Sequence, residues 1–239
     1  SWVKRGSDID SGLNVVYYFG HSVTLSDDGN TIAIGSLRGG STGHAGIYDW
    51  NGSAWVQRGS NIYGEESGDL FGNSVSLSSD GNTVAIGALT NNRGMFLSEA
   101  GYTRIHQWDG SAWVQRGSDI YGEVRDDNSG WSVSLSSDGD IVAIGAKSND
   151  GNDGNIDRSG HTRVYQWDGS DWQQIGSDID GEAAADNSGW SVSLSSDGST
   201  VAIGATGNDG NGDNSGHVRV FSLTSDSTAA ITTAESPAE

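Results

Sequence analysis

The sequence predicts an all-β fold: a β-propeller of four four-stranded antiparallel blades whose ring is closed by the N-terminal strand. Three observations predict it. A repeat occurs four times, each repeat carries four short apolar segments in one order, and the 239 residues include 37 glycines but a single proline. Glycine at this level indicates many tight turns, and a fixed period decides the architecture before local patterns are read.

The repeat is clearest in a turn of the type Ser-Asp-Gly. The glycines of this turn, Gly29, Gly81, Gly139 and Gly198, are separated by 52, 58 and 59 residues. Four units of this size, each a small group of strands, are typical of radial or stacked repeat proteins. The repeats run over residues of about 1–52, 53–110, 111–169 and 170–225.

The four apolar segments of each repeat have the features of short strands. In the third repeat they lie at residues 113–116, 132–135, 141–144 and 162–167. They are rich in Val, Ile, Tyr and Trp, alternate in polarity and are bounded by Gly, Asp, Asn and Ser. The Ser-Asp-Gly turn predicts a hairpin between the second and third segments, because Asp and Gly accept positive φ. A Trp-Asp-Gly-Ser turn connects the fourth segment to the next repeat.

The reading frame of the repeat predicts how the ring closes. The chain opens with Trp2-Val3-Lys4-Arg5, a first segment, and ends its last repeat on a fourth segment, Val218-Arg219-Val220-Phe221. If each blade ends on the first segment of the following repeat, the last blade lacks an outer strand, and we expect the N-terminal strand to supply it. Closure would remove unpaired edges. A stacked solenoid and a fragment of a larger ring remain alternatives. Residues 226–239 are expected to form a flexible Ser/Thr/Ala-rich tail or linker.

Two motifs carry a resemblance to known families. Residues Phe71-Gly72-Asn73-Ser74-Val75, followed by Val84-Ala85-Ile86-Gly87-Ala88, resemble the FG-GAP repeat of integrin-α-type propellers, and the Ser-Ser-Asp-Gly turn is similar to that of TolB-like and WD40-type blades. The resemblance covers residues 1–225 and implies a propeller fold. The calcium loop of the FG-GAP family lies where this chain has only a tight turn, so that site is not carried over.

Composition argues against several classes of partner and chemistry. Twelve Lys and Arg against 32 Asp and Glu give a net charge of −20, which repels the phosphates of nucleic acids. No apolar run is long enough for membrane insertion. The absence of cysteine removes disulfides and thiolate ligands, so any metal site is built from oxygen or imidazole groups.

The long connections of the repeats predict where a ligand binds. Because strand direction alternates, the two tight turns of each blade lie on one face of the ring, and the long acidic connections lie on the other, here called the long-loop face. Two of these connections interleave hard oxygen ligands with glycine, which suits calcium, although the same residues also form ordinary solvated turns. The predicted calcium ligands are Asp150, Asn152, Asp153, Asn155, Asp157, Asp209, Asn211 and Asp213.

Aromatic and acidic residues beside these loops are candidates for ligand contacts. Trp131 and Trp190 begin inner strands on the long-loop face, next to Asp127 and Asp186. Indole faces and carboxylates of this kind bind sugars or proteins, but the tryptophans can equally pack between blades. The other tryptophans bracket short turns as cross-strand pairs. His44, His161 and His217 recur at one position of the repeat, and we expect them to serve packing.

The sequence therefore predicts a non-enzymatic, extracellular or cell-surface binding and structural module that takes part in adhesion. No nucleophile with a base partner is recognisable. Calcium is the expected cofactor, and the expected partner is a protein or glycan on the long-loop face. A multivalent carbohydrate-binding lectin and a subunit of a self-assembling surface structure are the alternatives. The acidic composition, the lack of cysteine and the glycosylation-type tripeptide Asn51-Gly52-Ser53 favour an outside location.

Overall fold

The computed structural model describes residues 1–12, 18–37, 42–90, 99–150 and 158–223. Over these residues the protein consists of strands and turns without a helix. No helix there is long and apolar enough to cross a membrane. The predicted tail at 226–239 lies outside the described residues.

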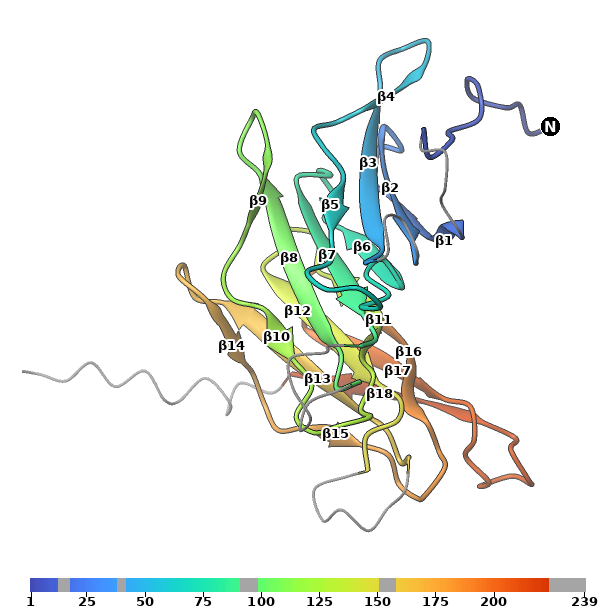
Figure 1. Ribbon diagram of the computed structural model, residues 1–239. Coiled ribbons are helices and arrows are strands. Elements are labelled where there is room, and N and C mark those ends of the chain that lie inside the picture. Colours follow the sequence, from blue (N-terminus) through green and yellow to red (C-terminus); the bar gives the residue numbers. More distant parts are fainter. Residues whose placement is uncertain (13–17, 38–41, 91–98, 151–157, 224–239) are drawn as a thin grey trace, which may run out of the picture.

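The strands form four antiparallel sheets, one for each repeat, that follow one another along the molecule from sheet 1 (blue) to sheet 4 (orange to red) (Figure 1). Sheet 1 contains β1 (Phe19–Leu25), β2 (Thr31–Ser36), β3 (His44–Trp50), β4 (Trp55–Gln57) and β5 (Ile62–Tyr63). Sheet 2 contains β6 (Ser74–Leu77), β7 (Thr83–Ala88), β8 (Tyr102–Trp108), β9 (Trp113–Gln115) and β10 (Ile120–Tyr121). Sheet 3 contains β11 (Ser129–Leu135), β12 (Ile141–Ala146), β13 (His161–Trp167), β14 (Trp172–Gln174) and β15 (Ile179–Asp180). Sheet 4 contains β16 (Ser188–Leu194), β17 (Thr200–Ala205) and β18 (His217–Ser222).

The predicted strand order within each sheet is confirmed, with one refinement at the outer edge. Sheets 1 and 3 run in the order inner, second, third and outer strand, each paired with the next. The outer strand is split: β4 pairs with one end of β3 through Trp50 and Trp55, and β5 pairs with the other end through His44 and Tyr63. The split follows the Arg-Gly-Ser segment of the repeat, where Gly59 has a φ of 72°, a conformation that interrupts a strand.

The Ser-Asp-Gly turns form the predicted hairpins, and the aspartate explains why. In sheet 2 the Asp80 carboxylate accepts the backbone N–H of Asn82 at 2.9 Å and the Ser78 hydroxyl at 2.7 Å. The hydrogen bonds stabilise the charged form and outweigh the effect of partial burial, so the pKa of Asp80 is lowered. Gly81 takes the positive φ of 68° that closes the turn.

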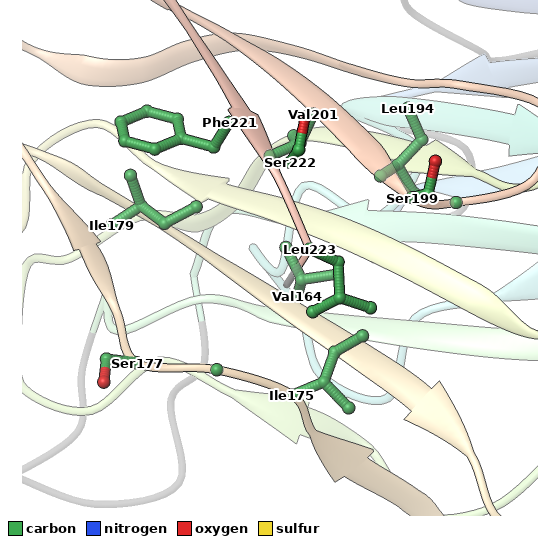
Figure 2. A pocket seen from close by; sticks show the side chains of 12 residues that line it. Val164, Ile175, Ser177, Ile179, Leu194, Ser199, Val201, Phe221, Ser222 and Leu223 are labelled. Atoms are coloured by element: carbon green, nitrogen blue, oxygen red, sulfur yellow. The ribbon is translucent and has the colours of Figure 1, made fainter. Parts of the chain in front are cut away.

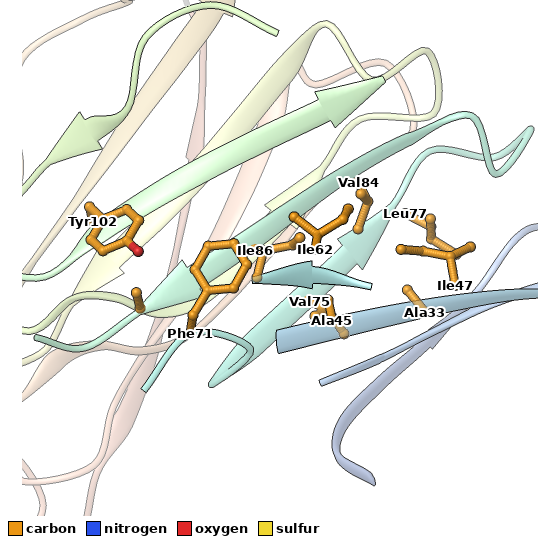
Figure 3. Close-up of a cluster of buried hydrophobic side chains, with 11 residues drawn as sticks. Ala33, Ala45, Ile47, Ile62, Phe71, Val75, Leu77, Val84, Ile86 and Tyr102 are labelled. Atoms are coloured by element: carbon orange, nitrogen blue, oxygen red, sulfur yellow. The ribbon is translucent and has the colours of Figure 1, made fainter. Parts of the chain in front are cut away.

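The core lies in the contacts between successive sheets, here called seams. In the first seam, Ile47 and Ile62 of sheet 1 pack against Val75, Leu77 and Ile86 of sheet 2 (Figure 3). The second and third seams repeat this arrangement with the equivalent residues. The close approach of the backbones depends on a glycine in each seam, since a Cβ on Gly87 would lie 2.2 Å from the carbonyl oxygen of Gly130.

The predicted closure of the ring by the N-terminal strand is absent from the structure. Residues 1–12 form no strand, and within the described residues β18 pairs only with β17. The N-terminal segment is instead attached to sheet 1, where Arg5 donates to the carbonyl of Gly29 at 2.6 Å and stacks on Trp50. Sheets 1 and 4 lie at opposite ends of the row (Figure 1), so the attachment holds this segment away from β18.

Candidate functional site on the long-loop face

The long connections on this face are organised by one buried aspartate in each of three repeats. In sheet 3 the Asp127 carboxylate is fully buried and accepts the backbone N–H groups of Glu123 and Val124 at 2.8 and 2.9 Å. It also accepts the side-chain amide of Asn149 at 3.1 Å, which joins two neighbouring loops. Burial raises the pKa of Asp127 despite these hydrogen bonds.

Asp186, which the sequence predicts together with Asp127 as a ligand contact, has the same structural role in the next repeat. Its carboxylate, 1% exposed, accepts the N–H groups of Glu182 and Ala183 and the side chain of Asn208 at 3.1 Å. Buried carboxylates held in this way shape the loops.

A polar hollow opens beside the Asp127 loop. Its volume is about 370 Å³ and it is lined by Glu99, Asp126, Asn128, Ser148, Asp150 and Arg158. Three carboxylates against one guanidinium leave a net negative charge, and the Asn and Ser side chains add neutral oxygen atoms. Glu99 and Asp126 lie exposed. Such a set of hard oxygen ligands suits a divalent cation of the calcium type or several hydroxyl groups.

The wall of the hollow is fixed by an unusual backbone. Glu99, Asp126, Asn128 and Arg158 all have positive φ, between 54° and 69°, a conformation that costs energy for residues with a side chain. The backbone N–H of Arg158 donates to Asp150 at 3.0 Å. The same backbone recurs outside the hollow at Leu70, Ala185 and Asn187, so it is a feature of the repeat's long connections.

Two tryptophans lie next to the hollow, as the sequence predicts for the inner strands. The rings of Trp131 and Trp190 are 5.1 Å apart, and the Lys147 ammonium lies 4.1 Å from the first ring and 5.3 Å from the second. Trp190 is 42% exposed. Burial, followed by the charge of Arg158, lowers the pKa of Lys147. The result is an aromatic and cationic surface continuous with the acidic hollow through Ser148, whose hydroxyl lies 3.4 Å from the Lys147 amine.

The predicted calcium ligands lie in different parts of the molecule, and some fall outside the described residues. Asp150 lies in the hollow, whereas Asn152, Asp153, Asn155 and Asp157 fall outside the described residues. In the last repeat the Asp209 carboxylate accepts the N–H of Asn214, and the N–H of Asn211 lies 3.3 Å from the Ser215 hydroxyl. Asp213 is exposed. The groups of three potential metal ligands within the described residues include neither Asp209 nor Asp213, and they do not include Glu99, Asp126 or Asp150 of the hollow either.

Two further groups combine one histidine with two acidic residues: Glu123, His161 and Asp178, and Glu182, Asp186 and His217. In each group the ligand atoms lie within 4.8 Å of one another. His161 is buried, which together with the charge of Arg163 lowers its pKa to about 4, so the imidazole is neutral at pH 7. Arg163 lies 3.5 Å from Glu123 and competes with a metal for that carboxylate. The histidines do not meet in one centre, in line with the packing role expected for them.

The sequence does not predict Glu99, Ser148 and Arg158 among the six lining residues of the hollow. The lining residues come from three connections, and only the pairing of sheets 2 and 3 brings them together. Asp126, shortly before the strand of Trp131, was visible as a member of an Asp-Asp-Asn run. The positive φ of Glu99 and Arg158 cannot be predicted from a single sequence, because neither residue type favours this conformation.

Comparisons with known proteins support the repeat and the fold. The family model described as FG-GAP repeat matches residues 178–221, which span β15, β16, β17 and most of β18. The resemblance to FG-GAP repeats is thereby confirmed for the last repeat. No curated protein matches the chain.

Two solved structures are similar to the whole row of sheets. The putative TolB from Agrobacterium tumefaciens is 13% identical, with a TM-score of 0.50 over 87% of this chain and 63% of its own. A putative 6-phosphogluconolactonase from Bacteroides fragilis is 12% identical, with a TM-score of 0.56 over 94% of this chain and 56% of its own. The chain thus spans about three fifths of the length of these structures. At such identities the likeness shows the fold alone, an all-β arrangement of repeated antiparallel sheets in the manner of propeller blades.

Proposed function

We propose that this chain is a non-enzymatic binding and structural module, extracellular or at the cell surface, that mediates protein or matrix interactions through its long-loop face. The four sheets serve as propeller-type blades, and their seams position the long loops. The observation that carries the proposal is the acidic hollow of Glu99, Asp126 and Asp150 beside the exposed Trp190. Function on repeat scaffolds of this kind resides in such loops.

Calcium is the cation that this hollow fits best. Its carboxylate, amide and hydroxyl oxygens are the ligand types that calcium prefers. The three carboxylates would have to move towards one another to reach one ion, because they do not form a group within 4.8 Å. The irregular loop backbone tolerates the flexible geometry of calcium better than the strict octahedron of magnesium. Sites with few charges bind in the range of extracellular calcium concentrations, which agrees with a location outside the cell.

A multivalent lectin is the alternative favoured by a specific observation. The Trp131 and Trp190 rings, with Lys147 between them, offer apolar faces for a sugar ring next to polar groups for its hydroxyls. The equivalent positions in the first two repeats are His21 and Asn73. A lectin site would therefore exist once, at the junction of sheets 3 and 4, rather than in every blade. A self-assembling subunit is the third candidate.

The calcium proposal predicts a metal-dependent stability. We expect a thermal melt in millimolar calcium to lie several degrees above the melt in chelator, because a ligand that binds only the folded state stabilises it. Asp126→Asn and Asp150→Asn should each reduce the shift by removing one charged ligand. Differential scanning calorimetry of the 239-residue chain provides the measurement.

Glu66→Gln is the matched control, since Glu66 is an exposed acid of the equivalent loop before sheet 2 outside the hollow. It should keep the full calcium shift. A shift that all variants share, or none in the wild type, would contradict a calcium site in the hollow. A glycan array then separates the two binding proposals, because only the lectin depends on Trp190, and Trp190→Ala should abolish its sugar signal.

A further inference from the structure

The first sheet exposes apolar side chains that are buried in the sheets behind it. Val23 and Leu25 of β1 are 61% and 55% exposed. Val75 and Leu77 hold the same positions in sheet 2 and are 9% and 8% exposed, because they pack against sheet 1. The side of sheet 1 that carries Val23 and Leu25, here called the head face, is therefore the half of a seam that receives a preceding sheet.

The last sheet exposes the opposite half. Val218 and Val220 of β18 are 68% and 64% exposed. Ile47 and Ile105 hold the position of Val220 in sheets 1 and 2, where they are fully buried by the following sheet. The side of sheet 4 that carries Val218 and Val220 is here called the tail face.

We propose that the tail face of one molecule binds the head face of a second molecule of this chain, and that the contact reproduces the internal seam. The seam occurs three times within the chain. The head and tail faces carry the same repeat positions as the two sides of this seam, so they are complementary in shape and hydrophobicity. Contiguous exposed apolar residues of this kind mark interaction sites. The head and tail faces lie at opposite ends of the row (Figure 1), which favours a second molecule over self-closure.

The N-terminal segment is already placed to complete the last sheet of the second molecule. In the first seam, Trp113 donates its indole N–H to the carbonyl of Arg58 at 2.8 Å. Trp55 makes the same contact with the carbonyl of Arg5 at 3.1 Å. Arg5 therefore lies against sheet 1 as Arg58 lies against sheet 2, in the place of an outer strand from a preceding sheet. A tail face docked on the head face would meet this segment along β18.

A cavity in the tail half of the molecule fits the tryptophan of that segment. It measures about 210 Å³ and is lined by Val164, Ile175, Val201, Phe221, Leu223 and neighbouring residues of sheets 3 and 4 (Figure 2). Trp172 occupies the equivalent place in the preceding seam and donates to the carbonyl of Arg116 at 2.8 Å. Trp2 holds the position of Trp172 in the repeat and is fully exposed. We infer that Trp2 of the second molecule fills the cavity.

An incompletely bonded guanidinium on the tail face points to the same partner. In sheet 2 the Arg104 guanidinium binds both carboxylate oxygens of Asp119 at 2.6 Å. Arg219 holds the position of Arg104 in sheet 4. It lies 3.8 Å from the Glu182 carboxylate, but its buried Nε has no hydrogen-bond partner within the described residues. Asp8 holds the position of Asp119 in the N-terminal segment, where its 79% exposed side chain pairs with the exposed Lys4 at 2.7 Å. Asp8 of the second molecule would exchange this surface pair for the Arg219 guanidinium and supply the missing acceptor.

The contact is heterologous, because the head and tail faces are different surfaces. Association of this type produces a closed ring where the rotation between molecules closes and an open chain where it does not. The head and tail faces contain none of the hollow residues, so failure of the calcium proposal and failure of this inference are separate results.

Sedimentation equilibrium over a range of concentrations tests the inference on the 239-residue chain. We expect the mass of the wild type to rise with concentration. Trp2→Ala and Val220→Asp should abolish the rise, and each should keep a cooperative melt because both side chains are exposed in the single molecule. Val114→Asp is the matched control, since Val114 is 49% exposed on β9 away from both faces, and it should associate as the wild type does.

Charge exchange at Asp8 and Arg219 identifies the contact itself. Asp8→Arg and Arg219→Asp should each weaken association at least tenfold, and the double variant should regain most of it. A wild type that stays monomeric at all concentrations would overturn the inference. If Trp2 is then shielded from iodide quenching, the cavity belongs to the same molecule's N-terminus. If a chain truncated after Leu223 has an accessible cavity and the full chain does not, the chain's own C-terminal residues fill it. Association that persists in Val220→Asp would also refute the proposed faces.

Discussion

Gly87→Ala is expected to destabilise the protein by about 3 kcal/mol or more, near the upper range of overpacking effects. A Cβ at Gly87 would lie 2.2 Å from the carbonyl oxygen of Gly130 and 2.4 Å from the Ser74 hydroxyl oxygen. The Gly130 carbonyl belongs to the backbone of the next sheet, which cannot move aside without opening the seam. Urea denaturation at pH 7 measures the loss.

Gly204→Ala is the internal control for this prediction. Gly204 holds the position of Gly87 in sheet 4, where a Cβ would meet the flexible Ser191 hydroxyl at 2.5 Å and no backbone atom closer than 3.8 Å. We expect a much smaller change in the free energy of unfolding of the single molecule. Equal losses in the two variants would contradict the assignment of Gly87 to a packed seam and Gly204 to an open one. In the head-to-tail assembly Gly204 faces the second molecule, so the same variant should lower association.

The second large effect concerns His106. As the pH falls from 6.5 to 4, this residue is expected to lower the free energy of unfolding. Burial, followed by the charge of Arg104, lowers the pKa of His106 from 6.5 to about 4. The unfolded chain therefore takes up a proton in this range while the folded protein does not. The contribution of His106 is complete above pH 6.5, decreases as the pH falls towards 4 and amounts to about 3 kcal/mol.

His106→Phe is the variant that isolates this effect, because the repeat already uses an aromatic residue at this position. Tyr48, Tyr165 and Phe221 hold it in the other three sheets. We expect the free energy of unfolding of the variant to vary less with pH between 6.5 and 4. Urea titrations at several pH values supply the data. An unchanged pH dependence in His106→Phe would show that His106 is not buried as a neutral group.

The repeat explains why so much of the fold follows from the sequence. Strand order, both tight turns and the placement of the long loops on one face all depend on local patterns that recur four times, such as the Asp80 turn. The split of the outer strand at Gly59 was missed, because a two-residue strand such as β5 has no period of its own. Closure was predicted from the reading frame alone, and the frame does not distinguish a partner strand in the same molecule from one in another.

The candidate site was less accessible to sequence reasoning for a physical reason. Asp127 and Asp186 were identified as notable acids, yet their role depends on burial and on the backbone N–H groups around them. Asp150 was predicted as a calcium ligand and lines the hollow, but its neighbours Glu99 and Arg158 join it only through the docking of adjacent sheets. Residues that meet between the loops of different repeats are not separated by a fixed number of positions, so a single sequence does not predict their contacts.

The chain forms a row of repeated sheets whose two ends are complementary halves of one seam. The most direct test mixes a head-blocked variant, Leu25→Asp, with a tail-blocked variant, Val220→Asp, and measures the mass by native mass spectrometry. Each variant alone should be monomeric, and the mixture should form a one-to-one dimer and nothing larger, because each molecule retains one working face. Monomers in the mixture, or dimers of either variant alone, would contradict the claim.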